Sequence, residues 1–291
     1  MSSREPDFSS SLDSGFWYWI TERHDIYLRR KTLTKPWTKD RILQQYKFTN
    51  AFRQLDKGTI ALRKMVEKYP SADSSSSLFN VWWYRLFNWH EHAELCGFVT
   101  DFAELVSYMT MRHETGKRVF TNAHMTTGVS CEDKYVSYLR AAREAFDNAE
   151  NVHKVWRNSS MEDTFARLRR YYMVGPFVAY EIVCDMRFLV PPAPIDVDDW
   201  ANLGPGARRG LIRLGLLSPS RTGKQAQELG LAAMKDLLAE AKETLPERVL
   251  EAEVPFELRE IEHSLCEFDK YERVRRGEGK PRLKYDGGNG L

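Results

Sequence analysis

Three carboxylates follow a proline-rich stop in the second half of the chain, at Asp196, Asp198 and Asp199. Clustered carboxylates can accept protons in general base catalysis. Asp196 and Asp198 are better candidates for a functional role than Asp199. The alternative is structural, because acidic residues after a proline stop also cap helix N-termini, where the helix dipole favours negative charge.

Arginines form the second group with chemical potential. Arg23 falls in the middle of an apolar helix face that also carries Phe16, Ile20 and Tyr27. A guanidinium buried alone is too costly, so Arg23 needs a partner or a ligand. Phosphoryl groups suit arginine, which binds them in a bidentate manner. The basic residues considered on this ground are Arg23, Arg29, Arg30, Lys31, Lys35, Arg53, Arg208 and Arg209, and a solvated face is the alternative for Arg29 and Lys31.

A Gly-Pro turn at Gly175 and Pro176 separates two predicted helices, ~20 residues before the acidic cluster. Such a turn directs free backbone N–H groups outward, where they can hold a DNA phosphate. The layout resembles the helix-hairpin-helix core of DNA-repair glycosylases, and it predicts DNA as the substrate. The usual hairpin has a glycine two residues before Gly175, where this chain has Met173. An ordinary corner between two helices is the alternative.

Other features suggest further contacts. Gly204 and Gly206 precede a short basic helix, and Gly206 would let the backbone approach an anion closely. Lys270 lies three residues after Glu267, and Asp56 three after Arg53, which is a spacing that allows pairing on a helix. Four histidines could be interpreted as metal ligands, but no metal motif groups them: His24, His90, His92 and His263. We therefore predict no protein metal site.

Composition limits the class of protein. The chain has 291 residues, 42% hydrophobic, with a net charge of only +2, so a DNA-binding surface must be a local patch. Its cysteines are too far apart for a zinc or iron–sulfur motif and suit a reducing compartment: Cys96, Cys131, Cys184 and Cys266. The sequence has no apolar signal segment or membrane span. We expect a cytoplasmic protein with no membrane partner.

The periodicity predicts an all-α protein, without a strand pattern strong enough for a sheet. Residues 1–14 are predicted to be disordered, residues 15–276 to form a single helical domain, and residues 277–291 to form a tail over the surface. Helices are predicted at about 16–30, 48–66, 78–89, 98–113, 132–147, 161–172, 176–188, 224–243 and 255–272, with a short basic helix within 199–217.

Several of these segments together resemble one family. The resemblance is carried by Phe16–Arg30, Lys35–Thr38, Phe48–Asp56, Val174–Phe177, Asp196–Gly210 and Leu265–Tyr271. They are similar to the α-glutamyl/putrescinyl thymine pyrophosphorylases, or amino acid:DNA transferases, of bacteriophage thymidine hypermodification. Relatives of that family are fused to 5-hydroxymethyluracil DNA kinases. This sequence has no G-x-x-x-x-G-K-[ST] motif, so it is not itself a P-loop kinase.

The resemblance implies a glycosylase-like scaffold and a reaction. An amine or amino acid displaces pyrophosphate from 5-pyrophosphoryloxymethyl-deoxyuridine in double-stranded DNA. The base must be turned out of the stack, the leaving pyrophosphate needs arginines, and the incoming ammonium must lose a proton. The resemblance does not identify the nucleophile, since glycine, serine, glutamate and putrescine need different pockets. It implies no certain cofactor and leaves open whether Mg²⁺ accompanies the pyrophosphate.

Roles follow from the resemblance as expectations. The catalytic candidates are Asp196, Asp198, Arg23 and Arg53. The substrate-binding candidates are Arg30, Asp56, Lys35, Trp37, Trp200, Arg208, Arg209 and Lys270. Of these, Trp37 and Trp200 would stack on the base. The DNA-binding candidates are Gly175, Pro176, Gly204 and Gly206. Two other functions stay open, namely a base-excision glycosylase that acts on a modified pyrimidine, and a non-catalytic DNA-binding partner of a 5-hydroxymethyluracil DNA kinase.

Overall fold

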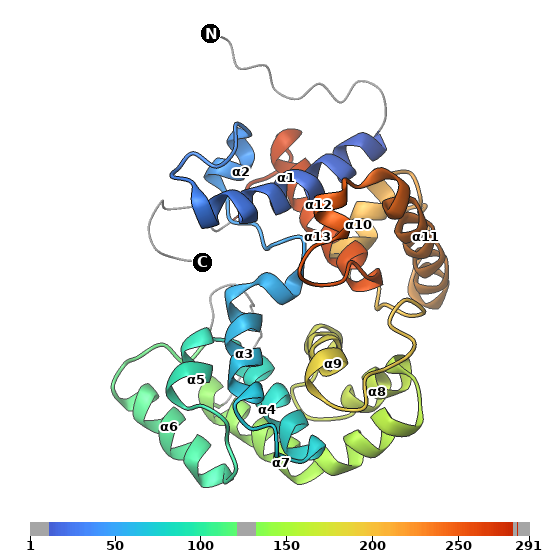
Figure 1. Ribbon diagram of the computed structural model, residues 1–291. Helices are drawn as coiled ribbons and strands as arrows, with labels where there is room; N and C mark the ends of the chain where they lie inside the picture. Colours follow the sequence, from blue (N-terminus) through green and yellow to red (C-terminus); the bar gives the residue numbers. More distant parts are fainter. Residues whose placement is uncertain (1–11, 121–131, 282–283, 285–291) are drawn as a thin grey trace. The chain divides into compact units, whose positions relative to one another are not determined.

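The computed structural model describes residues 12–120, 132–281 and 284, and these residues are mainly helical (Figure 1). The prediction of an all-α protein is confirmed for this part of the chain, where the only β-type pairing is an isolated bridge between Tyr46 and Lys284. The described residues divide into two compact units. Unit 1 contains the residues up to Asp56 and those from Asp198 onward, and unit 2 contains Lys57–Val197. The single domain predicted for residues 15–276 stays a prediction, because compact units need not fold independently.

Unit 1 is built around one helix, α13, because α1, α2, α10 and α11 all pack against it. Its elements are α1 (Leu12–Thr32), α2 (Arg41–Gln45), the 3₁₀ helix η1 (Arg53–Leu55), α10 (Pro205–Arg213), α11 (Gly223–Thr244), α12 (Glu247–Leu250) and α13 (Leu258–Arg275). Helix α13 buries Ile261, Leu265 and Phe268 on one face. Helix α10 approaches α13 closely at Gly210, where a β-carbon would lie 2.5 Å from the Leu265 carbonyl oxygen.

Unit 2 is centred on the aromatic helix α4, which contacts α3, α7 and α9. Its helices are α3 (Lys57–Glu67), α4 (Ser74–Phe87), α5 (His90–Leu95), α6 (Phe102–Glu114), α7 (Lys134–Asn158), α8 (Met161–Leu168) and α9 (Pro176–Leu189). Burial of Trp82 and Trp83 in α4 confirms the predicted buried helix. Aromatic side chains supply large apolar area, so they anchor a core efficiently.

The turn before α9 has the predicted local form. Gly175 is the N-cap of α9 and Pro176 its first residue. Met173 adopts a φ of 60°, the left-handed conformation that glycine occupies most easily. The chain therefore makes a tight turn here with a methionine in the left-handed conformation. A helix-hairpin-helix at this turn stays a prediction.

One predicted helix is wrong. The pattern from Phe48 to Val66 predicted a continuous helix, but residues 46–52 are non-helical, η1 follows, and α3 starts only at Lys57. Side chains close this turn: Asp56 Oδ1 accepts hydrogen bonds from the Asn50 backbone N–H and from Asn50 Nδ2, both at 2.9 Å. Asn and Asp side chains that bond nearby backbone groups compete with helix formation.

The ends of the chain were predicted to be irregular. Helix α1 already begins at Leu12, so residues 12–14, predicted to be disordered, belong to it. The rest of the predicted N-terminal disorder, most of the predicted tail and Cys131 lie outside the described residues. Within the described part, no helix is long and apolar enough to cross a membrane.

His92 in unit 2 gives the fold a pH dependence. Its Nε2 lies 2.8 Å from the Val119 carbonyl oxygen and its Nδ1 3.0 Å from the Tyr108 hydroxyl. Burial lowers the pKa of His92 to about 4, although the hydrogen bond to Val119 opposes this shift. A lowered histidine pKa means that the folded state stays neutral while the unfolded chain protonates. This contribution to stability is complete above the unfolded pKa of about 6.5 and is lost as the pH falls toward 4.

We expect the free energy of unfolding to fall by about 3 kcal/mol from this group between pH 7 and pH 4. Urea denaturation at a series of pH values measures the loss. In His92→Gln, whose amide can still donate to Val119, the loss should shrink by that amount. His153→Gln, which changes a histidine bonded to the Pro191 carbonyl, is the matched control. Equal pH dependence in wild type and His92→Gln would contradict this assignment.

Candidate functional site

A cavity of about 270 Å³ lies in unit 1, between the end of α1, the loop after it and the segment that follows α2. We call it the cationic pocket. It is lined by Arg23, Ile26, Arg30, Lys35, Pro36, Trp37, Thr38, Leu43, Gln44, Tyr46, Lys47 and Phe48. Four of these side chains are cationic, and none of the described lining residues is acidic. Such a lining attracts an anion.

The pocket brings together residues that the sequence placed in separate motifs. Arg23 and Arg30 come from α1, and Lys35 and Trp37 from the following loop. The sequence prediction missed the fourth cation, Lys47. Lys47 lies just before Phe48, where the wrongly predicted continuous helix begins. The backbone of this segment is non-helical, and this places Lys47 beside the other three cations of the pocket.

Arg23 is the most deeply placed cation of the pocket, since it is only 3% exposed. Its Nη2 donates to the Phe48 carbonyl oxygen at 3.3 Å. The expectation that this arginine finds a partner is therefore confirmed, and the Phe48 backbone is one such partner. Three further cations and no acidic residue among the described lining residues give the pocket a positive potential.

Trp37 positions the other cations. Its Nε1 donates to the Leu33 carbonyl oxygen at 2.8 Å, which holds the ring against the end of α1. The Arg30 guanidinium lies 5.3 Å and the Lys35 ammonium 5.2 Å from the ring centroid. These are cation–π distances. Base stacking on Trp37 stays a prediction, and it would require a cation to move aside.

A buried carboxylate, Asp40, lies between the loop and α2. Asp40 caps α2 and accepts hydrogen bonds from the hydroxyls of Tyr18, at 3.2 Å, and Tyr271, at 2.7 Å. Burial and the neighbouring Asp40 charge raise the pKa of both phenols, so both remain donors. Asp40 thus ties α1 and α13 to the start of α2.

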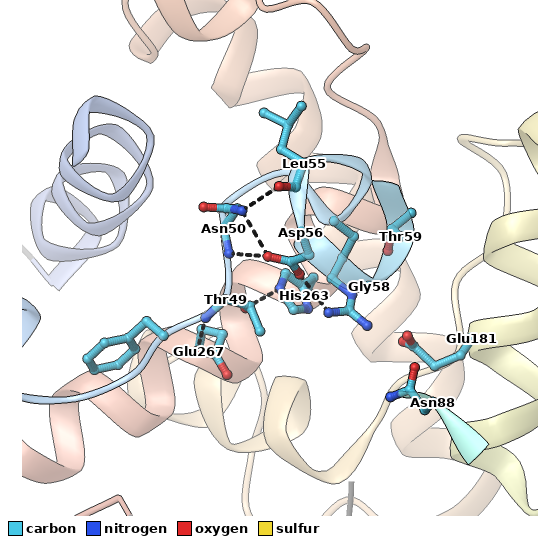
Figure 2. Close-up of polar contacts among 12 residues, drawn as sticks. Thr49, Asn50, Leu55, Asp56, Gly58, Thr59, Asn88, Glu181, His263 and Glu267 are labelled. Atoms are coloured by element: carbon cyan, nitrogen blue, oxygen red, sulfur yellow. Dashed lines mark hydrogen bonds and ion pairs between the residues drawn. The ribbon is translucent and has the colours of Figure 1, made fainter. Parts of the chain in front are cut away.

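A second polar group adjoins the pocket at Phe48 and continues through the Thr49–Asp56 turn (Figure 2). Arg53 Nη1 donates to Asp56 Oδ2 at 2.7 Å, so the predicted pair forms. Asp56 also accepts the two hydrogen bonds from Asn50 described above. Asn50 Nδ2 donates in addition to the Leu55 carbonyl oxygen at 2.8 Å. The turn is rigid because its side chains satisfy its own backbone.

One stripe of α13 faces this turn. His263 Nε2 lies 2.5 Å from Thr49 Oγ1, and Glu267 Oε2 accepts from the Thr49 backbone N–H at 3.1 Å (Figure 2). Lys270 Nζ donates to Glu267 Oε2 at 2.8 Å, as the spacing predicted, and lies 4.6 Å from the Phe48 ring centroid. Positions 263, 267 and 270 follow helical spacing, so the sequence could predict that they share one face of a helix. It could not predict that this face packs against the Thr49–Asp56 turn.

Asp196 and Asp198 each contact a helix N-terminus. Asp196 Oδ2 accepts from the backbone N–H of Met161, the first residue of α8, at 2.9 Å. Asp198 Oδ1 accepts from the backbone N–H of Leu258, the first residue of α13, at 2.9 Å. Both aspartates therefore contact a helix N-terminus, which is the structural alternative to a catalytic role. The helices that they contact are distant in sequence. Their predicted catalytic role stays a prediction.

We expect Asp196→Ala to lower the free energy of unfolding by about 1 kcal/mol, the usual cost of losing a cap. Asp196→Asn keeps an acceptor oxygen and should restore most of that loss in thermal unfolding. The same pair of variants applies to Asp198. A folded Asn variant also separates the two roles, because turnover lost at unchanged stability would require the carboxylate charge itself. Unchanged stability in Asp196→Ala would contradict the capping role.

The remaining candidates are tied into unit 1. Arg208 Nη2 donates to the carbonyl oxygens of Pro219, at 2.7 Å, and Arg221, at 2.6 Å. Arg209 Nε pairs with the buried Asp269 at 2.7 Å. Trp200 is buried. Base stacking by Trp200 stays a prediction, and it would require the base to reach a buried ring. Substrate binding by Arg208 and Arg209 also stays a prediction, and it would require these side chains to leave their present partners.

The predicted phosphate-binding glycines stand at helix starts. Gly204 is the N-cap of α10. A β-carbon on Gly206 would lie 2.2 Å from Cys266 Sγ, so this glycine permits close packing of α10 on α13. Gly175 and Pro176 begin α9 in unit 2. Anion contact at these turns stays a prediction.

The described cysteines and possible metal ligands bear on the sequence predictions of thiol and metal chemistry; the absence of a metal stays a prediction. Burial raises the pKa of both Cys96 and Cys266 to about 12, which keeps these thiols protonated and unreactive. Among the described residues, no group of three or more His, Cys, Asp or Glu side chains could hold a metal ion.

Comparisons with known proteins give one family. Residues 10–281 match the family model described as the helical domain of 5-hmdU DNA kinase. A 5-hmdU DNA kinase of Bacillus phage SP10 is 27% identical over 236 residues, which cover 72% of this chain and 37% of the kinase. The chain thus matches little more than a third of that relative's length. No solved structure matches the chain.

Proposed function

From the membership of this chain in the family of 5-hmdU DNA kinase helical domains, we propose that it is a DNA-modifying transferase of thymidine hypermodification. An amine or amino acid would displace pyrophosphate from 5-pyrophosphoryloxymethyl-deoxyuridine in double-stranded DNA. The observation that carries this proposal is the cationic pocket, which presents four cations and no carboxylate among its described lining residues. The family connects the chain to modified thymidine, and the pocket fits a diphosphate leaving group.

The proposed roles follow the geometry. Arg23, Arg30, Lys35 and Lys47 bind the pyrophosphate and stabilise the charge that develops on its bridging oxygen as the carbon–oxygen bond breaks. The aromatic rings of the pocket contact the pyrimidine after it has left the stack. Any Mg²⁺ would arrive on the pyrophosphate oxygens, because that cation usually keeps several waters and few protein ligands.

The scaffold is part of the proposal. The left-handed turn at Met173 and the Gly175-Pro176 start of α9 support a helix-hairpin-helix, glycosylase-like arrangement in unit 2. The N–H groups at the start of α9 would then hold a DNA phosphate. This element would provide affinity without base specificity, since phosphate contacts carry no sequence information.

The test is direct. The full chain is incubated with a duplex that carries one 5-pyrophosphoryloxymethyl-deoxyuridine and with a mixture of glycine, serine, glutamate and putrescine, and the nucleosides are analysed by mass spectrometry. We expect one amine adduct together with released pyrophosphate. Abasic sites would instead identify a base-excision glycosylase. Tight DNA binding without any product would identify a non-catalytic DNA-binding partner of a kinase, which the match to part of a 5-hmdU DNA kinase favours as the second candidate.

A further inference from the structure

Thr49 and His263 form a close pair that the cationic pocket does not include. Thr49 Oγ1 and His263 Nε2 lie 2.5 Å apart, within hydrogen-bond distance of a hydroxyl and an imidazole. Both residues are partly exposed, so a small molecule can reach them. A hydroxyl held by a histidine is the arrangement through which a proton can be passed from a bound group to the imidazole.

The position of the hydroxyl is fixed from three directions. The Thr49 backbone N–H is bound by Glu267, and the following residue, Asn50, is held by Asp56. The preceding residue, Phe48, lines the cationic pocket, and its carbonyl oxygen is bound by Arg23. Thr49 therefore follows, in sequence, a residue that lines the proposed pyrophosphate site, on a segment anchored at both ends.

Charged groups around the pair are already matched. On α13, Glu267 is paired with Lys270 at 2.8 Å, and on the facing turn Asp56 is paired with Arg53 at 2.7 Å. A carboxylate that holds a cation is a poor proton acceptor, because protonation would break the pair. Histidine exchanges protons near neutral pH, so His263 is the group in this cluster suited to accept one.

We propose that Thr49 and His263 deprotonate the incoming amine, a role that rests on the proposed transferase function. The Thr49 oxygen accepts a proton from the ammonium group while the Thr49 hydroxyl proton passes to His263 Nε2. The amine nitrogen then bonds to the exocyclic carbon of the pyrimidine. The carbon–oxygen bond to pyrophosphate breaks, and pyrophosphate leaves with the electron pair. The site would thus take a primary amine in its ammonium form.

The experiment compares two kinds of nucleophile on the same duplex with wild type, His263→Gln, Thr49→Val and Thr49→Ser. One nucleophile is the amine that wild type uses, which is protonated at neutral pH. The other is methoxyamine, which is unprotonated at neutral pH and needs no base. We expect His263→Gln and Thr49→Val to lose about 100-fold or more in rate with the first, the range of general base catalysis, and only a few-fold with methoxyamine. Thr49→Ser, which keeps the hydroxyl, should retain activity with both.

The pH–rate profile adds a second measurement. In wild type the rate with the protonated amine should rise with pH as His263 loses its proton, and this rise should vanish in His263→Gln. Thermal unfolding establishes that the variants fold, and His153→Gln is the control for a histidine change elsewhere. Equal losses with both nucleophiles would refute the proton-transfer role and leave the transferase function standing. If wild type forms no adduct with any amine, the transferase proposal itself fails, and the role of this pair fails with it.

Discussion

Replacement of Arg23 by methionine is expected to lower kcat/KM for the transfer reaction by about 1,000-fold. Arg23 is the most buried of the four cations in the pocket, at 3% exposure, and its Nη2 donates to the Phe48 carbonyl oxygen. A charge in such surroundings acts on an anion with little screening by water. Loss of one donor that stabilises a developing negative charge costs 100- to 1,000-fold in characterised enzymes, and the burial of Arg23 favours the upper end.

The measurement has two parts. Turnover is followed by nucleoside mass spectrometry, and binding by the rise in melting temperature that inorganic pyrophosphate produces in a protein that binds it. Wild type should be stabilised and Arg23→Met should not. Arg23→Lys keeps the charge but loses the planar guanidinium, so an intermediate loss of about 10-fold is expected. Arg63→Met removes a partly exposed arginine of α3 and is the control. Full activity in a folded Arg23→Met variant would show that the cationic pocket does not take part in the transfer reaction.

Replacement of Arg85 by methionine is expected to destabilise unit 2 by about 4 kcal/mol. The guanidinium contacts both oxygens of Asp185, and it donates to Thr59 Oγ1 at 3.0 Å and to Asn88 Oδ1 at 2.9 Å. Glu181 lies 3.8 Å away. All three ionic side chains are buried. Without the arginine, two carboxylates would remain in the interior without this cation, and removal of one partner of a buried pair costs about 3–5 kcal/mol.

Urea denaturation measures this effect. Arg143→Met removes an arginine that pairs with Asp147 at 2.9 Å on the surface, and it should cost less than about 1 kcal/mol. The double variant Arg85→Met with Asp185→Leu should recover part of the loss, because an apolar replacement of a buried pair removes the uncompensated charge. A cost for Arg85→Met as small as that for Arg143→Met would show that the buried cluster does not stabilise the unit.

Much of the fold could be predicted from local patterns. The helices near 78–89, 176–188, 224–243 and 255–272 follow from apolar periodicity, and α9 from the Gly-Pro start signal. The error at residues 48–66 has a specific cause. The apolar spacing there suits a helix, but Asn50 and Asp56 bond each other and the backbone, and this local closure outweighs the pattern. The short helices α2, α5 and α12 were missed because four to six residues carry too little periodicity.

Some residues of the candidate site could be predicted from their type, but the sequence could not predict which residues lie together in it. Arg23 was recognisable because a guanidinium on an apolar stripe needs a counterpart. Lys47 and Thr49 gave no such signal, since an isolated lysine or threonine is ordinary in any sequence. His263 was noticed only as one of several histidines, and its partner lies more than two hundred residues away in the chain.

The sequence by itself determined that the protein is helical, where the Gly-Pro turn lies, and which arginines require a ligand or partner, because these depend on periodicity, backbone chemistry and the cost of burying charge. Only the tertiary structure decided which of these residues meet. It joined Arg23, Arg30, Lys35 and Lys47 in one pocket, placed Thr49 against His263, and set Asp196 and Asp198 on the N-termini of helices distant in sequence. The Thr49–His263 contact depends on how α13 packs against the segment after α2. Packing between distant segments leaves no periodic trace in either of them.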